Sequence, residues 1–102
     1  LFDMETTNVM LNEKNRGEVQ LFSDGNKAGY MEISVYNQRL TVYHTEVDPQ
    51  YEGRGFAKLL LEKLVSYARE SNLKIVALCP YVHAQFRRHP EDYQDIWYNK
   101  EA

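Results

Sequence analysis

The stretch that decides the fold is VDPQYEGRGFA, residues 47–57. It leaves a segment with strand-like residues, turns at Pro49, and runs through Gly53 and Gly55 into the start of a helix. A helix N-terminus carries unpaired N–H groups and the positive end of the macrodipole, so it attracts anions. Glycines let phosphate oxygens approach the backbone closely. The stretch therefore predicts an anion-binding loop between a strand and a helix.

The spacing of the glycines excludes two common phosphate-binding motifs. The stretch fits neither G-x-x-x-x-G-K-[ST], the Walker P-loop, nor G-x-G-x-x-G, the dinucleotide-binding fingerprint. It fits Q-x-x-G-x-G, with Gln50, Gly53 and Gly55 at the defined positions. On its own, this pattern is equally compatible with a plain strand-to-helix corner in which the glycines serve only the turn.

The residues ahead of the loop have the pattern of strands. Residues 28–36 alternate between polar and apolar side chains, which is typical of a strand with one face on a core. Shorter segments at 9–11 and 19–22 have the same character, and residues 39–47 are rich in β-branched and aromatic side chains. Turn residues separate these segments, so we expect an antiparallel meander.

The spacing of the apolar side chains changes after the loop, from the period of a strand to that of a helix. Apolar side chains recur at helical spacing across residues 56–70, with charged side chains on the other side, and predict an amphipathic helix of about four turns. Residues 73–78 form a short apolar strand. Pro80 suits the first position of a second helix, which makes Cys79 its N-cap and Pro90 its end.

The elements follow the order β-β-β-β-α-β-α in a single domain, residues 1–102. The strand–helix–strand portion implies that strands 39–47 and 73–79 are parallel and joined by a right-handed crossover. The earlier strands are expected to pair antiparallel. The prediction is an α+β fold with a mixed sheet of about five strands flanked by helices.

The composition excludes several classes of protein. Hydrophobic residues make up 43% of the chain and charged residues 26%, a balance typical of a globular domain. The net charge of −3 argues against nucleic acid as a partner. No apolar run is long enough for a membrane helix, and we expect neither a membrane partner nor a signal peptide. The single Cys79 excludes an internal disulfide, which favours a cytoplasmic location.

Several blocks of sequence carry a resemblance to a known family. Gln50-x-x-Gly53-x-Gly55 at the start of a helix resembles the acetyl-CoA signature of the GNAT N-acetyltransferases. Further blocks resemble the very small GNAT-like proteins called N-acetyltransferase-domain proteins: residues 44–47, 55–58, 78–81 and 86–91. The resemblance implies that the chain uses acetyl-CoA (CoA) as its cofactor.

The resemblance also implies a mechanism and a site. Strands 39–47 and 73–79 would splay apart around the pantetheine arm of CoA, and an acetyl group would pass from the thioester to an amine acceptor, either a small molecule or a protein amine. The residues expected to bind the cofactor are Glu46, Val47, Gln50, Gly53, Arg54, Gly55, Phe56, Ala57, Lys58 and Tyr81. Such chemistry needs a deprotonated amine, a stabilised oxyanion and an acid for the departing thiolate.

The expected catalytic residues are Cys79, His44 and His83. Many GNAT enzymes carry a tyrosine on the last helix as the acid, and the best-matching position here is Phe86, which has no proton to donate. Cys79 is the candidate substitute: as a thiol it could protonate the departing CoA, and as a thiolate, which a helix N-terminus favours by lowering the pKa, it could accept the acetyl group. His83 lies four residues further on, and His44 comes from the neighbouring parallel strand.

Each of these side chains also has a purely structural interpretation. Cys79 could be a small buried hydrophobe and His83 a solvated side chain. His44 could be a hydrogen-bonded structural histidine, pointing the same way as Val42 and Glu46. The histidines and Cys79 do not have a zinc-binding spacing, so we expect no metal.

Two functions stay open at this point. The first is an acetyl-CoA-dependent N-acetyltransferase. The second is a non-catalytic CoA- or acetyl-CoA-binding sensor or interaction module, which Phe86 in the acid position favours. Typical GNAT domains carry extra helices after the first strand, whereas residues 9–47 show no helical period. We therefore expect an open acceptor cleft, completed by a large substrate, by a second subunit in a homo-oligomer, or by nothing.

Overall fold

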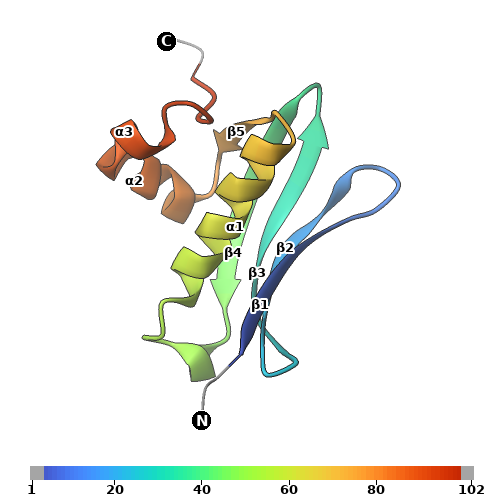
Figure 1. Cartoon of the computed structure of the whole chain (residues 1–102), viewed down its shortest axis with the longest axis vertical. Helices are drawn as coiled ribbons and strands as arrows, with labels where there is room; N and C mark the ends of the chain where they lie inside the picture. The colour runs from blue at the N-terminus through green and yellow to red at the C-terminus, as the bar shows by residue number, and fades with distance from the viewer. Residues whose placement is uncertain (1–3, 100–102) are drawn as a thin grey trace.

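The computed structural model describes residues 4–99, which form a five-stranded sheet with helices on one side. The strands are β1 (Glu5–Leu11), β2 (Arg16–Ser23), β3 (Asn26–Tyr36), β4 (Arg39–Val47) and β5 (Lys74–Ala77), and they lie in that order across the sheet (Figure 1). β4 and β5 are parallel, and the other neighbours are antiparallel. The predicted α+β fold with a mixed sheet is confirmed.

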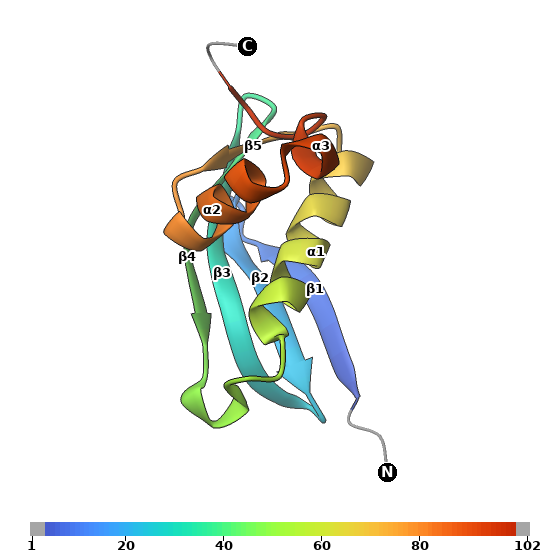
Figure 2. The same ribbon diagram turned by 90° about the vertical axis from the view of Figure 1, so that its left-hand side faces the viewer.

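The helices connect β4 to β5 and follow β5. They are a 3-10 turn η1 (Pro49–Tyr51), α1 (Phe56–Glu70), α2 (Pro80–Arg88) and the short α3 (Pro90–Tyr93). α1 runs across the sheet and contacts all five strands, and α2 contacts β4 and β5. Figure 2 shows α1, α2 and α3 in front of the same face of the sheet. Among residues 4–99, no helix has the length and apolar character needed to cross a membrane.

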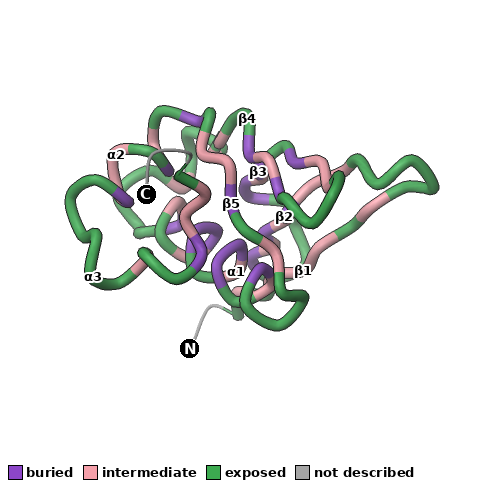
Figure 3. The backbone as a smooth tube through the Cα atoms, turned by 90° about the horizontal axis from the view of Figure 1, so that it is seen from above, coloured by how far each residue is buried: buried purple, intermediate pink, exposed green. Residues whose placement is uncertain are grey.

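The core lies between the sheet and α1. The helix spans the predicted residues and buries the stripe Phe56, Leu60, Leu61, Leu64, Val65 and Ala68. Inward side chains of the strands meet this stripe, among them Val19, Leu21, Met31, Ile33 and Leu40. Figure 3 shows the buried residues gathered along α1 and on the strands that face it. Within residues 4–99, no helix lies over the opposite face of the sheet.

A β-bulge in β4 redirects the side chains of its second half. The pairing with β3 skips one residue, which leaves Tyr43 as an extra residue between Val42 and His44. Tyr43 and His44 are consequently both exposed, and Thr45 resumes the inward direction. The expectation that His44 points the same way as Val42 is wrong, because Val42 is buried in the core and His44 shares the open face with Glu46.

β4 and β5 pair over only part of their length. The ladder ends at the pair Val42–Ala77, and β4 continues to Val47 paired with β3 but not with β5. The backbone N–H groups of Leu78 and Cys79 both donate to the carbonyl of Val42, at 3.1 and 2.9 Å, before the chain turns into α2. The predicted splay of the two strands is present, although β5 ends at Ala77 and not at residue 79.

The C-terminal segment completes the edge of the sheet. α2 ends at Arg88, as Pro90 suggested, but Pro90 also begins α3, which the sequence pattern did not predict. Further on, the N–H of Ile75 donates to the carbonyl of Ile96 at 2.6 Å, and the N–H of Tyr98 donates to the carbonyl of Ile75 at 2.8 Å. The segment therefore lies along the outer edge of β5.

The fully buried Leu64 tests the position of the core. We expect Leu64→Ala to lower the free energy of unfolding by about 2–5 kcal/mol, because it removes transfer energy and leaves a cavity. Ser66→Ala, on the exposed side of the same helix, should change it by less than about 0.5 kcal/mol. Urea unfolding measures both values, and equal losses would contradict the assigned core.

Candidate functional site

The loop between β4 and α1 presents backbone to a small hollow. Gly53 and Gly55 have positive φ angles of 82° and 75°, which other residues rarely adopt. A Cβ atom at either glycine would meet nothing within 4 Å, so the space beside them is open. The hollow measures about 210 Å³ and is lined by Val47, Tyr51, Glu52, Gly53, Gly55, Phe56 and Ala57.

The start of α1 offers donors to this hollow. Gly55 is the N-cap residue and has no side-chain oxygen to cap the first amides, and no acidic residue lies in the first turn. The first N–H groups of a helix have no intrahelical acceptor, and the positive end of the dipole lies beside them. The arrangement fits a phosphate group, as the sequence pattern predicted.

Two cationic side chains flank the loop. The guanidinium of Arg54 lies 5.4 Å from the ring centroid of Tyr51 and 4.9 Å from that of Phe56. One of its nitrogens is 3.8 Å from the carboxylate of Glu5 on β1. Lys58 is exposed in the first turn of α1. Both cations could therefore add charge to an anion held by the loop.

Backbone groups of β4 face the gap beside β5. The N–H of Asp48 donates to the carbonyl of Ala28 on β3 at 2.8 Å. Backbone groups alternate in direction along a strand, so those of Glu46 also face β3. The N–H and C=O groups of Thr45 and Val47 then face the opposite way, into the gap. This edge of β4 is available for pairing with a ligand.

Two further predicted binding residues, Gln50 and Tyr81, lie on the elements that follow β4 and β5. Gln50 is exposed in η1, and its N–H donates to the carboxylate of Asp48 at 3.1 Å. Tyr81 is half-buried in α2. Burial, together with nearby acidic groups, raises the pKa of Tyr81, so its hydroxyl stays protonated at neutral pH.

Cys79 lies where β5 gives way to α2, at the N-cap position. Its side chain is only 2% exposed, and its Sγ lies 3.1 Å from the Oγ1 of Thr45. The thiol therefore bonds across the gap to β4 and does not cap its own helix. Thr45 was not singled out from the sequence, because the bulge that turns it inward has no reliable sequence signature.

His83 lies on α2, and its ring packs against Trp97. Its ring is exposed and meets the ring of Trp97 edge-on, with 5.8 Å between the centroids. Its backbone N–H donates to the carbonyl of Cys79 at 2.9 Å, which is a bond of the helix itself. Within residues 4–99, no side-chain hydrogen bond joins His83 to Cys79.

His44 lies on the open face of the sheet. Its Nε2 is 3.1 Å from Oε1 of Glu46, and its ring centroid is 6.2 Å from that of Tyr30. The described residues include no hydrogen bond between His44 and Cys79, whose thiol lies on the helix face. The two predicted catalytic residues thus stand on opposite sides of the gap.

Phe86 stands where the sequence resemblance would place the tyrosine of many GNAT enzymes, and its side chain belongs to the core. Its side chain is fully buried, and its ring centroid lies 4.7 Å from that of Tyr93 and 5.6 Å from that of Trp97. These contacts explain an apolar residue there in packing terms. A proton donor for the gap must come from another side chain.

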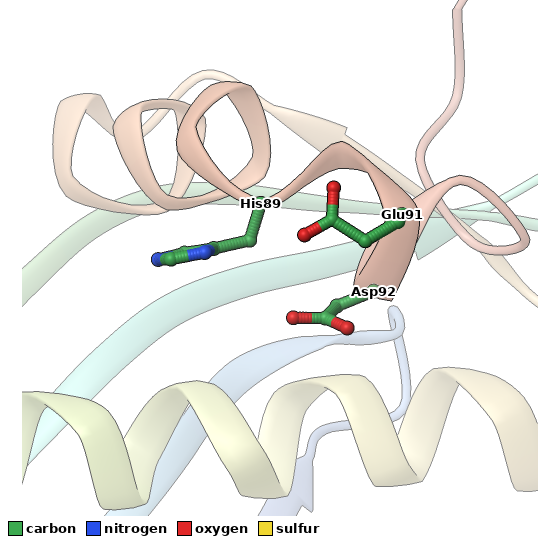
Figure 4. A group of neighbouring side chains, drawn as sticks. All are labelled: His89, Glu91 and Asp92. Atoms are coloured by element: carbon green, nitrogen blue, oxygen red, sulfur yellow. The ribbon is translucent and has the colours of Figure 1, made fainter.

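Three potential metal ligands gather where α2 meets α3. The ligand atoms of His89, Glu91 and Asp92 lie within 4.8 Å of one another, and Figure 4 shows the three side chains projecting from this junction. All three residues are exposed, so water can solvate each of them. We assign no ion to this group, and the absence of a metal stays a prediction.

The burial of Cys79 makes its reactivity measurable. We expect the thiol to react with dithionitrobenzoate at least about tenfold more slowly in the native protein than in urea, because the reagent must wait for local opening. Thr45→Ala should speed the native reaction by opening space beside Sγ, whereas the distant Ser66→Ala should not. Equal rates in the native and unfolded protein would contradict the buried position.

Comparison with known proteins identifies the family of the chain. Residues 18–96 match the family model described as GCN5-related N-acetyl-transferase. The streptothricin acetyltransferase of Streptomyces lavendulae is 36% identical over 58 residues, which cover 55% of this chain and 31% of that protein. The chain therefore matches less than a third of the length of this curated relative.

Solved structures share the fold. The ribosomal-protein-S18-alanine N-acetyltransferase from Escherichia coli superposes with a TM-score of 0.65 at 17% identity, covering 72% of this chain and 66% of that one. A GCN5-like protein from Staphylococcus aureus gives 0.62 at 28% identity, covering 90% and 88%. Since the family match also spans most of the described residues, the chain belongs to the GCN5-related N-acetyltransferase (GNAT) family.

Proposed function

We propose that the protein is an acetyl-CoA-dependent N-acetyltransferase. The observation that carries this proposal is the start of α1, where Gly53 and Gly55 open a hollow beside uncapped helix amides. The family to which the chain belongs typically uses acetyl-CoA, which supplies an acetyl group activated as a thioester. The acceptor is an amine, and the structure supports a route for each reactant.

The route of the cofactor follows from the placement of the loop and the gap. The hollow would hold the pyrophosphate on backbone amides, with Arg54 and Lys58 as cationic neighbours. The backbone groups of Val47 and Thr45 would pair with the amides of the pantetheine arm. This route brings the thioester to the closed end of the gap, beside Cys79. The other expected contacts stay predictions: Glu46, Gln50, Phe56, Ala57 and Tyr81.

The candidate catalytic side chains approach from two faces. On the helix face, the thiol of Cys79 would give its proton to the departing thiolate, and the hydroxyl of Thr45 would hold the thiol in place. On the open face, His44 beside Glu46 would accept the proton of the attacking amine. Burial of Cys79 favours this role over that of a solvent-accessible nucleophile. His83 is the weaker candidate because its ring packs against Trp97 and no hydrogen bond among the described residues joins it to the thiol.

A second candidate function is a non-catalytic CoA- or acetyl-CoA-binding module. The buried Phe86 favours it, because the position that many relatives use for a proton donor is closed off in the core. Both functions need the same cofactor site. They differ in turnover, which the second of the following experiments measures.

The first experiment tests the phosphate site with a matched pair of glycines. We expect Gly53→Val to abolish the binding of CoA in calorimetry, because a side chain would fill the space of the pyrophosphate. Gly25, in the β2–β3 turn, has a similar φ of 84° and equally open surroundings. Gly25→Val should therefore carry a comparable backbone strain of about 1–3 kcal/mol and keep CoA binding. If Gly53→Val bound CoA as tightly as the wild type, the assignment of the pyrophosphate to this loop would be wrong.

The second experiment tests Cys79. We expect Cys79→Ala to lower kcat for acetyl transfer by about 100- to 10,000-fold, the usual contribution of a general acid, without a matching loss of CoA affinity. Release of CoA against a panel of amines measures turnover, and Thr45→Ser, which keeps the hydroxyl, serves as the control. If Cys79→Ala turned over as fast as the wild type, Cys79 would have only a structural role. Tight CoA binding without turnover of any amine in the wild type would favour the binding module.

A further inference from the structure

The first residue of β1 places a carboxylate close to the loop that precedes α1. Glu5 pairs with Ser23 in the β1–β2 ladder, and Ser23 lies with Val19 and Leu21 on the face of the sheet that carries the core. Residues paired directly across a ladder share a face, so the side chain of Glu5 also lies on the helix side. Figure 1 shows that β1 begins at the end of the molecule where the loop enters α1.

A buried hydroxyl holds this carboxylate in place. Among residues 4–99, Ser23 is the only buried residue whose side chain carries a nitrogen or an oxygen. Its Oγ donates to Oε2 of Glu5 at 3.2 Å. A buried hydroxyl without a hydrogen-bond partner is costly, so the bond favours the conformation in which the carboxylate lies against Ser23. The position of the carboxylate is therefore fixed from within the sheet.

The same carboxylate oxygen faces Arg54 of the loop. Nη2 of Arg54 lies 3.8 Å from Oε2 of Glu5, and the two side chains keep 36% and 25% of their exposure. The guanidinium also lies against the rings of Tyr51 and Phe56, which stack on each other with 5.4 Å between their centroids. These contacts connect the sheet to the loop through one arginine side chain.

Arg54 stands between the two glycines that open the hollow. Gly53 and Gly55 line the hollow together with the two rings that Arg54 contacts. Glycine has more backbone conformations available than other residues, so a loop built on glycines loses more entropy when a ligand orders it. A fixed side chain between them restricts the backbone on both sides. Holding Arg54 therefore orders the amides that would receive a phosphate group.

We propose that Glu5 is a positioning residue for the cofactor, which holds Arg54 and, through it, the loop 53–55 in the conformation that receives a phosphate group. The proposal rests on the acetyltransferase function proposed above and adds a residue of β1 to its cofactor site. Glu5 acts through Arg54 and makes no contact of its own with the cofactor. Its contribution is preorganisation, because a loop that is already ordered loses less entropy on binding.

The order of the loop can be measured without any cofactor. Glu5→Gln keeps the length of the side chain and an oxygen for Ser23, but removes the charge that attracts Arg54. In amide NMR of the full chain, we expect the signals of Gly53 and Gly55 to shift and their order parameters to fall. Unchanged signals and order parameters of both glycines would contradict the proposal.

Glu18→Gln is the matched control, because it removes the same charge from another ion-paired glutamate of the sheet. Oε1 of Glu18 lies 2.6 Å from Nζ of Lys27, and this pair belongs to β2 and β3. The variant should leave the signals of the loop glycines as they are in the wild type. Thermal unfolding should show that both variants are folded at the temperature of the measurements.

The affinity for CoA tests the consequence for the cofactor. Calorimetry should show about two- to fivefold weaker binding in Glu5→Gln, the range expected for a surface ion pair, and unchanged binding in Glu18→Gln. In an Arg54→Ala background, Glu5→Gln should make no further difference, because Glu5 acts through Arg54. Equal losses in both backgrounds would overturn the proposal. Tighter binding by Glu5→Gln would also overturn it, since Glu5 would then compete with the phosphates for Arg54.

Turnover separates this proposal from the function on which it rests. Glu5→Gln should raise KM for acetyl-CoA and leave kcat unchanged, because the loop does not contact the reacting atoms. If the wild type bound CoA and Glu5→Gln weakened that binding, but no amine were acetylated, the acetyltransferase function would be wrong and the positioning role would be supported. If the wild type bound no CoA, both proposals would be wrong.

Discussion

The end of the β4–β5 ladder at Val42 is the constraint on which the site depends. The Val42 carbonyl accepts the N–H groups of both Leu78 and Cys79, and the bulge at Tyr43 breaks the register with β3 at the same level. Parallel strands that stayed in register would satisfy each other's backbone groups completely. Because the ladder stops here, the second half of β4 keeps one edge of donors and acceptors for a ligand, and Cys79 is brought against Thr45.

Local sequence patterns predicted most of the fold. The bounds of α1 follow from an apolar stripe of helical period between a glycine loop and a polar turn, and β4 follows from its β-branched and aromatic residues. β1 is longer than predicted, because its polar first half is held by backbone pairing with β2, which makes little demand on side-chain type. α3 was not predicted, because a proline such as Pro90 indicates the end of one helix but also suits the first position of the next.

The site was less predictable than the fold. Gly53 and Gly55 could be found because a loop with positive φ angles favours glycine, which is visible in the sequence. The face on which His44 lies and the contact of Thr45 could not, because a single extra residue at a bulge exchanges the inward and outward positions that follow it. The pairing of Glu18 on β2 with Glu32 on β3 could not be predicted either, because it depends on the register of a long hairpin. The local backbone conformation could therefore be predicted from the sequence, whereas the register between strands could not.

The hydrogen bonds along the outer edge of β5 have a consequence for the order of folding. Ile75 is held on one side by β4 and on the other by Ile96 and Tyr98, so β5 has a complete set of neighbours only after the tail has docked. Contacts between distant parts of a chain form late, after the entropy of closing the intervening loops has been lost. During synthesis, the β1–β4 meander can pair while the tail is still inside the ribosome. Cys79 and the closed end of the gap would then be among the last parts of the molecule to become ordered.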